Sequence, residues 1–348
     1  MRVILKAKVF ASRHIKHLDL TALIKFGVDE RHLIQVEPLD ADEVRDWLDK
    51  QSDDVREECE LAFDSGYRLD SDEYGQFSSF TIQVDRVDKA QWYQKAPLLP
   101  LEVALKFLSQ PFIIFVENRR NDSAFLRATA TGWRKQRLEK FLREDWIKFE
   151  TGGGITEVLE WVKEISNKPA QYLRGFALFD SDALEPDKPS KQSENVVTAC
   201  GKSVYFHRLR RRAIENYLPL STLSTWMGIN VHKKVKGILR RKLVDAFAKL
   251  SSEQRHHFNM KKGFKGDFKK TKPDDEKETE QEKEHRLVGN FYQNVSIEIR
   301  IVLAQGFGTD IAELFKEEQF FIKEKWLHDD KSVILELEPM LERLLSLV

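Results

Sequence analysis

The chain has 348 residues, and its 57 lysines and arginines are balanced by 57 aspartates and glutamates. This length allows two domains, or one domain with large additions. The zero net charge gives the whole protein no preference for polyanions, so any surface for nucleic acid must come from local charge clusters. No apolar stretch is long enough to span a bilayer, and we expect no membrane partner. Cys59 and Cys200 lie far apart, which suits a reducing cytoplasm, where we place the protein.

Residues 1–108 are expected to form an α+β region to which the sequence assigns no role. Hydrophobic alternation in the opening segment RVILKAKVF, and again in Phe77–Val87, predicts two strands. Ala41–Lys50 is predicted to be a helix capped by Asp40. None of these segments carries a catalytic pattern.

Residues 109–219 have the pattern of an α/β domain. Short apolar strands are predicted at PFIIFVE from Pro111, Trp146–Phe149, Leu173–Phe179 and SVYFH from Ser203. Helices are predicted between them, at Ser123–Arg143, Ile155–Ile165 and Lys191–Cys200. Strands that alternate with helices predict a doubly wound, Rossmann-like parallel sheet with helices on both faces. Ligands of such sheets bind at the carboxyl ends of the strands.

Residues 220–348 are predicted to form a mostly helical C-terminal region. Its later helices are expected at Val295–Leu303, Ile311–Phe315 and Ser332–Leu347. Residues 261–285 interrupt the helical pattern, because they contain almost no apolar side chains and change from lysine-rich to glutamate-rich. This composition predicts a mobile loop.

Three carboxylates follow two of the predicted strands. Glu117 ends the strand in PFIIFVE, and Asp180 and Asp182 follow the strand in GFALF. Neighbouring parallel strands end at the same edge of a sheet, so we expect the three acids to meet there and to need a cation between them. Such hard oxygen ligands suit Mg²⁺ or Mn²⁺, which can polarise a phosphoryl oxygen and activate water. Each acid alone is also an ordinary turn or capping residue.

The joint pattern resembles the Toprim domain of topoisomerases, primases and the overcoming-lysogenization-defect (OLD) nucleases. Glu117 in VENRRND matches the first, strand-terminal glutamate of that family, and Asp180 and Asp182 match its DxD motif. The loop Gly152–Gly154 falls where the family has its glycine turn. RRRAIENYLP, residues 210–219, resembles the helix after the last Toprim strand in OLD-like nucleases and related bacterial defence proteins. The resemblance covers about residues 111–219.

The resemblance implies one or two metal ions. Glu117, Asp180 and Asp182 would hold the first, and Glu215, in the ENY-containing segment, would help to hold a second. The alternative for Glu215 is a capping or salt-bridge role beside the neighbouring arginines.

Asp122 is a further candidate ligand of the second ion. It lies five residues after Glu117, where the family usually has an acid four residues on, and Asn118 replaces the usual glycine. Asp122 is an equally good candidate for the N-cap of a helix that begins near Ser123.

Basic residues flank the predicted site. Those expected to bind a phosphate backbone are Arg119, Arg120, Arg210, Arg211 and Arg212. The first two lie beside Glu117 and are suited to stabilising a charged transition state, unless they pair with nearby carboxylates. A second basic cluster, from His232 to Lys242, is expected to be a solvated helix face.

The chain has no visible ATPase motif. Gly201-Lys202-Ser203 looks like the end of a P-loop, but Val196 stands where that motif requires glycine. Since many OLD-like nucleases carry or recruit an ATPase, a separate ATPase or sensor protein is an expected partner by analogy. A homo-oligomer is also compatible with the sequence.

The main hypothesis is a Mg²⁺- or Mn²⁺-dependent endonuclease, a hydrolase of DNA or RNA that acts in bacterial antiviral defence. Its catalytic residues would be Glu117, Asp180, Asp182 and Glu215. Topoisomerase activity is less compatible, because it needs a nucleophilic tyrosine in a large accessory domain. The alternative is a non-catalytic Toprim module that binds nucleic acid or a protein partner. Carboxylate oxygens at about 2.1 Å from one point favour the nuclease, whereas a lysine or arginine at that point favours the binding module.

Overall fold

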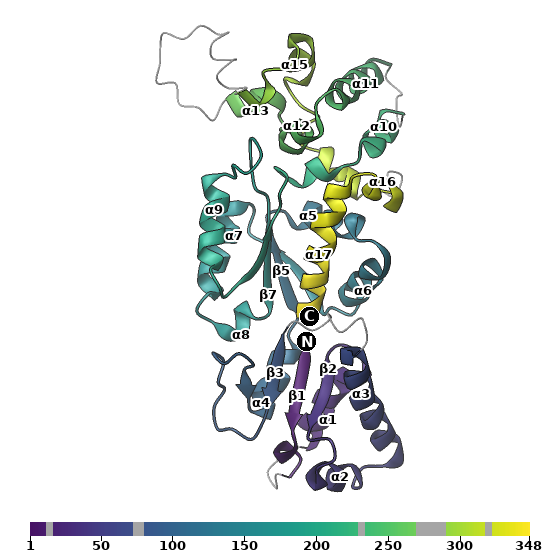
Figure 1. The fold of residues 1–348 in the computed structure, drawn as a ribbon, viewed down its shortest axis with the longest axis vertical. Helices are drawn as coiled ribbons and strands as arrows, with labels where there is room; N and C mark the ends of the chain where they lie inside the picture. Colours follow the sequence, from purple (N-terminus) through teal and green to yellow (C-terminus); the bar gives the residue numbers. More distant parts are fainter. Residues whose placement is uncertain (12–16, 72–79, 229–233, 269–289, 317–321) are drawn as a thin grey trace.

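The computed structural model describes residues 1–11, 17–71, 80–228, 234–268, 290–316 and 322–348. The molecule is elongated, with an N-terminal sheet, a second sheet and a helical region arranged along its length (Figure 1). Both ends of the chain lie at the junction of the two sheets (Figure 1). Of the helices described, none combines the length and the apolar character that crossing a membrane requires.

The N-terminal sheet is entirely parallel, in the order β2-β1-β3-β4. Its strands are β1 (Arg2–Lys6), β2 (Leu33–Glu37), β3 (Thr81–Val84) and β4 (Leu98–Leu99). The helices are α1 (His17–Val28), α2 (Asp42–Leu48), α3 (Asp53–Ser71) and α4 (Leu101–Ser109), with the 3-10 helix η1 (Ala7–Val9) after β1.

The α+β prediction for residues 1–108 is therefore wrong. Strand β2 and the long helices α1 and α3 were not recognised, and they supply the crossovers that parallel strands require. The capping prediction is also wrong, because Ala41 occupies the N-cap of α2 and no side chain caps this helix.

The second sheet confirms the parallel α/β prediction. Its order is β6-β5-β7-β8, and every pairing is parallel. The strands are β5 (Phe112–Val116), β6 (Ile147–Thr151), β7 (Gly175–Phe179) and β8 (Tyr205–Arg208). The helices are α5 (Arg119–Thr129), α6 (Gly132–Arg143), α7 (Ile155–Ile165), α8 (Pro169–Tyr172) and α9 (Lys191–Cys200). The helix predicted over Ser123–Arg143 is thus two helices, separated at Ala130 and Thr131.

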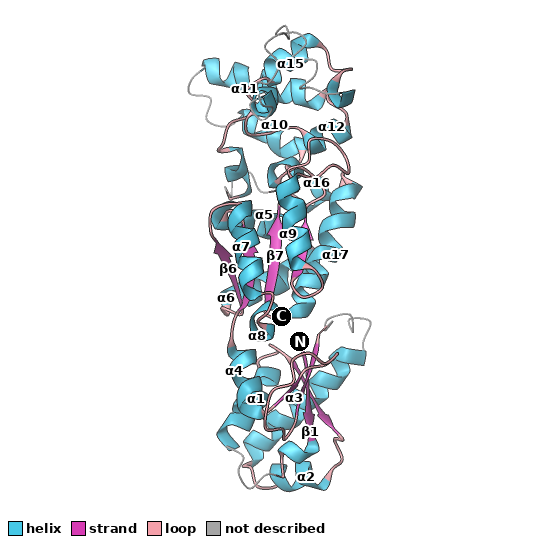
Figure 2. Ribbon diagram, turned by 90° about the vertical axis from the view of Figure 1, so that its left-hand side faces the viewer, coloured by secondary structure: helices cyan, strands magenta, loops and turns pink. Residues whose placement is uncertain are grey.

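Alternate residues of the buried strands face two different hydrophobic clusters. Phe115 and Phe179 pack with α7 and α9 in one cluster, whereas Ile114 and Leu178 belong to the cluster that includes α5 and α6. Figure 2 shows α7 and α9 together over this sheet. Since both faces are covered, the strands are apolar throughout and only their ends are available for polar side chains.

The two sheets share one topology. In each, the first strand lies inside the sheet, the second pairs on one side of it, and the third and fourth follow on the other side. The direction of chain winding therefore reverses between β1 and β3, and between β5 and β7. Such reversal points are where open α/β sheets bind ligands. In the second sheet this point lies between Glu117 and Asp180.

The C-terminal region is helical, as predicted. Its helices are α10 (Leu220–Gly228), α11 (Lys234–Ala248), α12 (Ser252–His257), α13 (Gly263–Phe268), α15 (Ile297–Leu303), α16 (Glu324–His328) and α17 (Lys331–Leu347). Its 3-10 helices are η4 (Asn290–Tyr292) and η5 (Ile311–Phe315), after η3 (Ile214–Tyr217). Of the loop predicted over residues 261–285, residues 263–268 form helix α13, so the prediction is wrong there, and residues 269–285 lie outside the described part. Helix α17 returns along the second sheet to the junction (Figure 1).

Two buried arginines connect the sheets at the junction. Arg31 donates to the carbonyl oxygens of Ser109 and Gln110 at 3.1 and 2.9 Å, and Arg174 also donates to Gln110. Arg31 precedes β2 and Arg174 precedes β7, so side chains from both sheets hold the end of α4 and the start of β5.

Candidate functional site

Glu117 joins the ends of three strands. It directly follows β5, and its Oε1 accepts a hydrogen bond from the main-chain N–H of Asp180 at 2.9 Å. Its carbonyl oxygen accepts the hydroxyl of Thr151, the last residue of β6, at 2.8 Å. The glycine loop that follows starts helix α7, and Gly153 and Gly154 have φ values of 103° and 129°, which favour glycine. The sequence thus places the carboxylate and the loop at one edge of the sheet.

The Asp-Ser-Asp turn is fixed to the segment that carries Glu215. Oδ1 of Asp180 accepts the main-chain N–H of Ile214 at 3.1 Å. Asp182 has a left-handed φ of 51°, and its N–H donates to the carbonyl of Arg212 at 2.9 Å. These bonds bring the third strand end and η3 together.

Glu215 is buried in η3, with 1% of its surface exposed. Its Oε1 lies 2.8 Å from the ammonium nitrogen of Lys261. Lys261 comes from the C-terminal region, directly before α13. A cavity of about 170 Å³ separates this lysine from the Asp-Ser-Asp turn, and both aspartates of the turn, Glu215 and Lys261 line it.

Asp122 lies inside helix α5 and is buried, with 7% of its surface exposed. The N-cap of α5 is Asn118, whose side chain accepts the N–H of Asn121 at 3.1 Å. The carboxylate of Asp122 reaches back and accepts the N–H of Asn118 at 2.8 Å. The N-cap interpretation of Asp122 is therefore wrong, because the helix begins four residues earlier than predicted.

Burial and mutual repulsion raise the pKa values of the acids at this edge. For Glu117, burial together with the charges of Asp122 and Asp182 raises the pKa to about 7, against the hydrogen bond from Asp180 and the charge of Lys261. Burial, and then the charge of Glu215, raise the pKa of Asp122 to about 7. For Asp180, burial followed by the charges of Glu117, Glu215 and Asp122 raises the pKa well above its ordinary value.

Lys261 is the cation among these acids. Burial lowers its pKa, but the carboxylates of Glu215, Asp180 and Asp122 raise it further, so the ammonium stays charged. The carboxylates near Lys261 outnumber this one positive group, and their mutual repulsion adds to burial in raising the pKa values of Glu117, Asp122 and Asp180. The excess charge and the hard oxygen donors fit a divalent cation.

The carboxylates do not lie close enough to one another to form a metal site in this conformation. Within the described ranges, no three His, Cys, Asp or Glu side chains converge closely enough to hold a metal ion. Lys261 lies close to the place where the sequence predicts the metal ion. The acids expected from sequence are therefore neighbours, and the cation that lies among them is the ammonium of Lys261.

The predicted phosphate contacts divide into two groups. Arg119, Arg120 and Arg210 are exposed. Arg211 and Arg212 are buried, with 6% and 5% of their surfaces exposed.

Arg211 and Arg212 are each paired with a carboxylate, and their contact with nucleic acid stays a prediction. Arg211 donates to Asp330 and Ser332 at 2.6 and 2.7 Å, and Arg212 donates to both carboxylate oxygens of Asp267 at 2.9 and 2.5 Å. They fasten the C-terminal region to the site. Of the second basic cluster, His232 and Lys233 lie outside the described residues.

Lys261 is the residue of this cluster that sequence reasoning missed. Its segment, KKGFKGDFKK, has the composition of a solvated loop, and no short motif links it to the acids. Comparison with known proteins supplies no precedent either, since the sequence matches no protein family and no curated protein, and the fold matches no solved structure.

The raised pKa of Glu117 predicts an unusual effect of pH on stability. Its pKa is about 7 in the folded protein and 4.5 ordinarily, so the folded state binds the proton more tightly and loses stability as pH rises from about 4.5 to 7. Glu117→Gln keeps an oxygen for the Asp180 N–H and removes this loss. We expect the variant to be more stable than wild type by about 1–3 kcal/mol at pH 8 in EDTA, with the difference vanishing near pH 4. Urea unfolding at pH 8 and pH 4 measures the difference in stability between the variant and wild type. An equal difference at both pH values would contradict the raised pKa of Glu117.

Proposed function

We propose that the chain is a Toprim-type, divalent-metal-dependent nuclease. The observation that carries the proposal is the gathering of Glu117, Asp122, Asp180, Asp182 and Glu215 at the carboxyl ends of β5 and β7. This edge is the reversal point of a parallel sheet, where ligands bind. The glycine loop after β6 adjoins it. The acid after the first strand, the glycine loop after the second and the Asp-Ser-Asp turn after the third support the pattern for which the family resemblance was drawn.

Glu117, Asp180 and Asp182 would hold one ion, and Asp122 and Glu215 would support a second. Bound there, Mg²⁺ or Mn²⁺ polarises a phosphoryl oxygen and activates water for hydrolysis of a phosphodiester. The hydrogen bond from Asp180 to Glu117 holds the latter's carboxylate toward the turn. The exposed Arg119 and Arg120, at the start of α5, are placed to attract a phosphate backbone.

A non-catalytic binding module is the second candidate. Two observations favour it: the ammonium of Lys261 lies 2.8 Å from Glu215, and no described acids converge at metal-binding distance. In that case Lys261 is a permanent structural cation. The role in antiviral defence and the ATPase partner belong to the family resemblance and remain part of the nuclease proposal.

Cleavage assays distinguish the nuclease from the non-catalytic binding module. Purified protein is incubated with plasmid DNA and with bulk tRNA, in Mg²⁺, in Mn²⁺ and in EDTA, beside Glu117→Ala. The nuclease proposal expects cutting of one substrate that requires the metal and disappears in the variant. Cutting that persists in Glu117→Ala would refute the assigned site. Binding of both substrates without cutting, at any metal concentration, would favour the binding module.

A further inference from the structure

A cavity of about 560 Å³ lies behind the carboxylate site. Its walls come from the segment that follows β8, the start of α10, helix α12 and the turn between α16 and α17. Asn216 lines this cavity as well as the smaller one beside Glu215. One segment, residues 211–217, therefore separates two cavities, with acids on one side and a different set of groups on the other.

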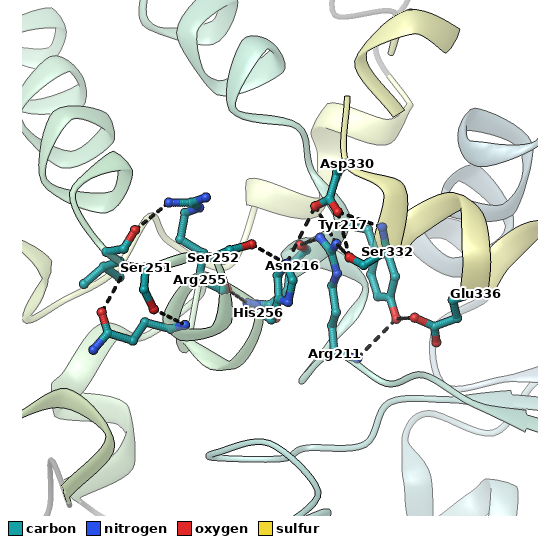
Figure 3. Close-up of polar contacts among 12 residues, drawn as sticks. Arg211, Asn216, Tyr217, Ser251, Ser252, Arg255, His256, Asp330, Ser332 and Glu336 are labelled. Atoms are coloured by element: carbon teal, nitrogen blue, oxygen red, sulfur yellow. Dashed lines mark hydrogen bonds and ion pairs between the residues drawn. The ribbon is translucent and has the colours of Figure 1, made fainter. Parts of the chain in front are cut away.

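The wall of the larger cavity is preformed. Arg211 donates to the carbonyl of Asn216 at 2.8 Å and to Asp330, whose other oxygen accepts from Ser332 at 2.7 Å (Figure 3). The guanidinium of Arg211 also lies 4.7 Å from the ring centroid of Tyr217. Because these groups are already paired, the cavity does not depend on a ligand for its shape.

The remaining lining is cationic and aromatic. Because Arg211 pairs with Asp330, the charges left in the lining are Arg255 and Lys331 against Asp329, and the formal charge is positive even with neutral His256. The half-buried Trp326 supplies ring surface, and the buried rings of Tyr217 and Phe247 form part of the wall behind it. The volume lies within the usual range for small-molecule sites of about 300–1,000 Å³.

A hydrolytic triad does not explain this cavity, although Ser252, His256 and Asp330 lie together in it (Figure 3). The hydroxyl of Ser252 is 3.3 Å from Nε2 of His256, and Oδ2 of Asp330 is 3.6 Å from the same nitrogen. A proton relay needs the serine and the aspartate on opposite ring nitrogens. These residues are therefore better suited to binding than to nucleophilic catalysis.

We propose that this cavity binds a phosphorylated nucleoside. Its ring surface suits a base, since bases stack on aromatic side chains, and its excess of cations suits a phosphate. Free nucleotides and the phosphorylated end of a nucleic acid share this chemistry. The inference does not rest on the proposed nuclease activity, because binding alone defines it.

Calorimetric titration of the full chain in EDTA tests the proposal, since EDTA prevents metal-mediated binding at the carboxylates. The probes are the four ribonucleoside monophosphates, adenosine and inorganic phosphate. We expect at least one monophosphate to bind at least tenfold more tightly than adenosine or phosphate alone. A 5′-phosphorylated tetranucleotide separates the two sources. If the cavity accepts the end of a nucleic acid, the tetranucleotide binds as tightly as the monophosphate. If the cavity accepts only free nucleotides, the tetranucleotide does not bind.

Two matched pairs of variants locate the binding. Trp326→Ala should weaken binding of the monophosphate about tenfold, whereas Trp133→Ala should not change it. Trp133 is the matched control because both tryptophans are half-buried and have a cation about 5 Å from the ring. Lys331→Ala, at an exposed position that does not threaten folding, should weaken binding about threefold, and the exposed Lys325→Ala should leave it unchanged. No binding of any monophosphate, or equal losses within each pair, would overturn the proposal.

Discussion

Lys261→Met is expected to destabilise the protein by about 2–3 kcal/mol in EDTA, and Mn²⁺ is expected to restore most of that loss. The variant leaves Glu215, which is 1% exposed, without its charged partner at 2.8 Å. Breaking a buried ion pair costs about 3–5 kcal/mol, and the partial exposure of the lysine, 39% of its side chain, reduces the figure. Thermal and urea unfolding with and without Mn²⁺ measure both effects.

Lys262→Met is the matched control. Lys262 is the next residue, is exposed and lines the same small cavity, but it forms no ion pair with Glu215. We expect its substitution to change stability by less than about 0.5 kcal/mol.

The two arms of the Lys261 experiment answer different questions. Loss of stability tests the ion pair, and recovery with Mn²⁺ tests whether the carboxylates accept a divalent ion in place of an ammonium. A destabilised variant that Mn²⁺ does not restore would count against the metal site and favour the binding module. A variant as stable as wild type would show that Glu215 does not depend on Lys261.

The sequence located the acids because their positions follow from local rules. Glu117 and Asp180 end apolar runs that can only be buried strands, and parallel strands end at one edge. Helices α7 and α9 were predicted with the observed bounds for the same reason, since their apolar faces repeat with helical spacing.

Contacts between distant segments could not be predicted in this way. Lys261 meets Glu215 only because the C-terminal region folds back onto the sheet. Arg212 looked like a surface arginine in a basic run, but Asp267, from a segment predicted to be a loop, takes its charge. A charge run in sequence does not reveal which of its members are exposed.

The prediction for the N-terminal sheet was wrong for a different reason. Strand β2 reads LIQVE, which is short and contains a buried glutamine, so its hydrophobic pattern is weak. Gln35 is satisfied by donating to the carbonyl of Gly66 in α3, at 3.1 Å. A tertiary hydrogen bond thus permits a polar residue in a buried strand, where a pattern-based prediction expects an apolar one.

One buried carboxylate, Glu336, connects helix α17 to the end of β8 and to η3. Its side chain is 2% exposed and accepts the hydroxyl of Tyr217 at 2.7 Å, the N–H of Arg210 at 2.7 Å and Nε2 of His207 at 3.0 Å. Figure 3 shows Tyr217 pointing at this carboxylate from the segment that also carries Arg211. The C-terminal helix is therefore fastened to the same residues that separate the two cavities.

Glu336→Ala should destabilise the protein by about 3–4 kcal/mol at pH 7, because it leaves the Tyr217 hydroxyl and the Arg210 N–H buried without their acceptor. Burial raises the pKa of Glu336, but the three hydrogen bonds lower it further, to below the ordinary 4.5. Its contribution to stability is therefore present above about pH 4.5 and lost as pH falls further, so wild type and variant should converge in acid. Glu324→Ala, at a carboxylate 57% exposed in α16, should cost less than about 0.5 kcal/mol. Urea unfolding at pH 7 and at about pH 3 provides the measurement, and a Glu336→Ala cost below about 1 kcal/mol at pH 7 would show that the three hydrogen bonds of Glu336 do not hold α17.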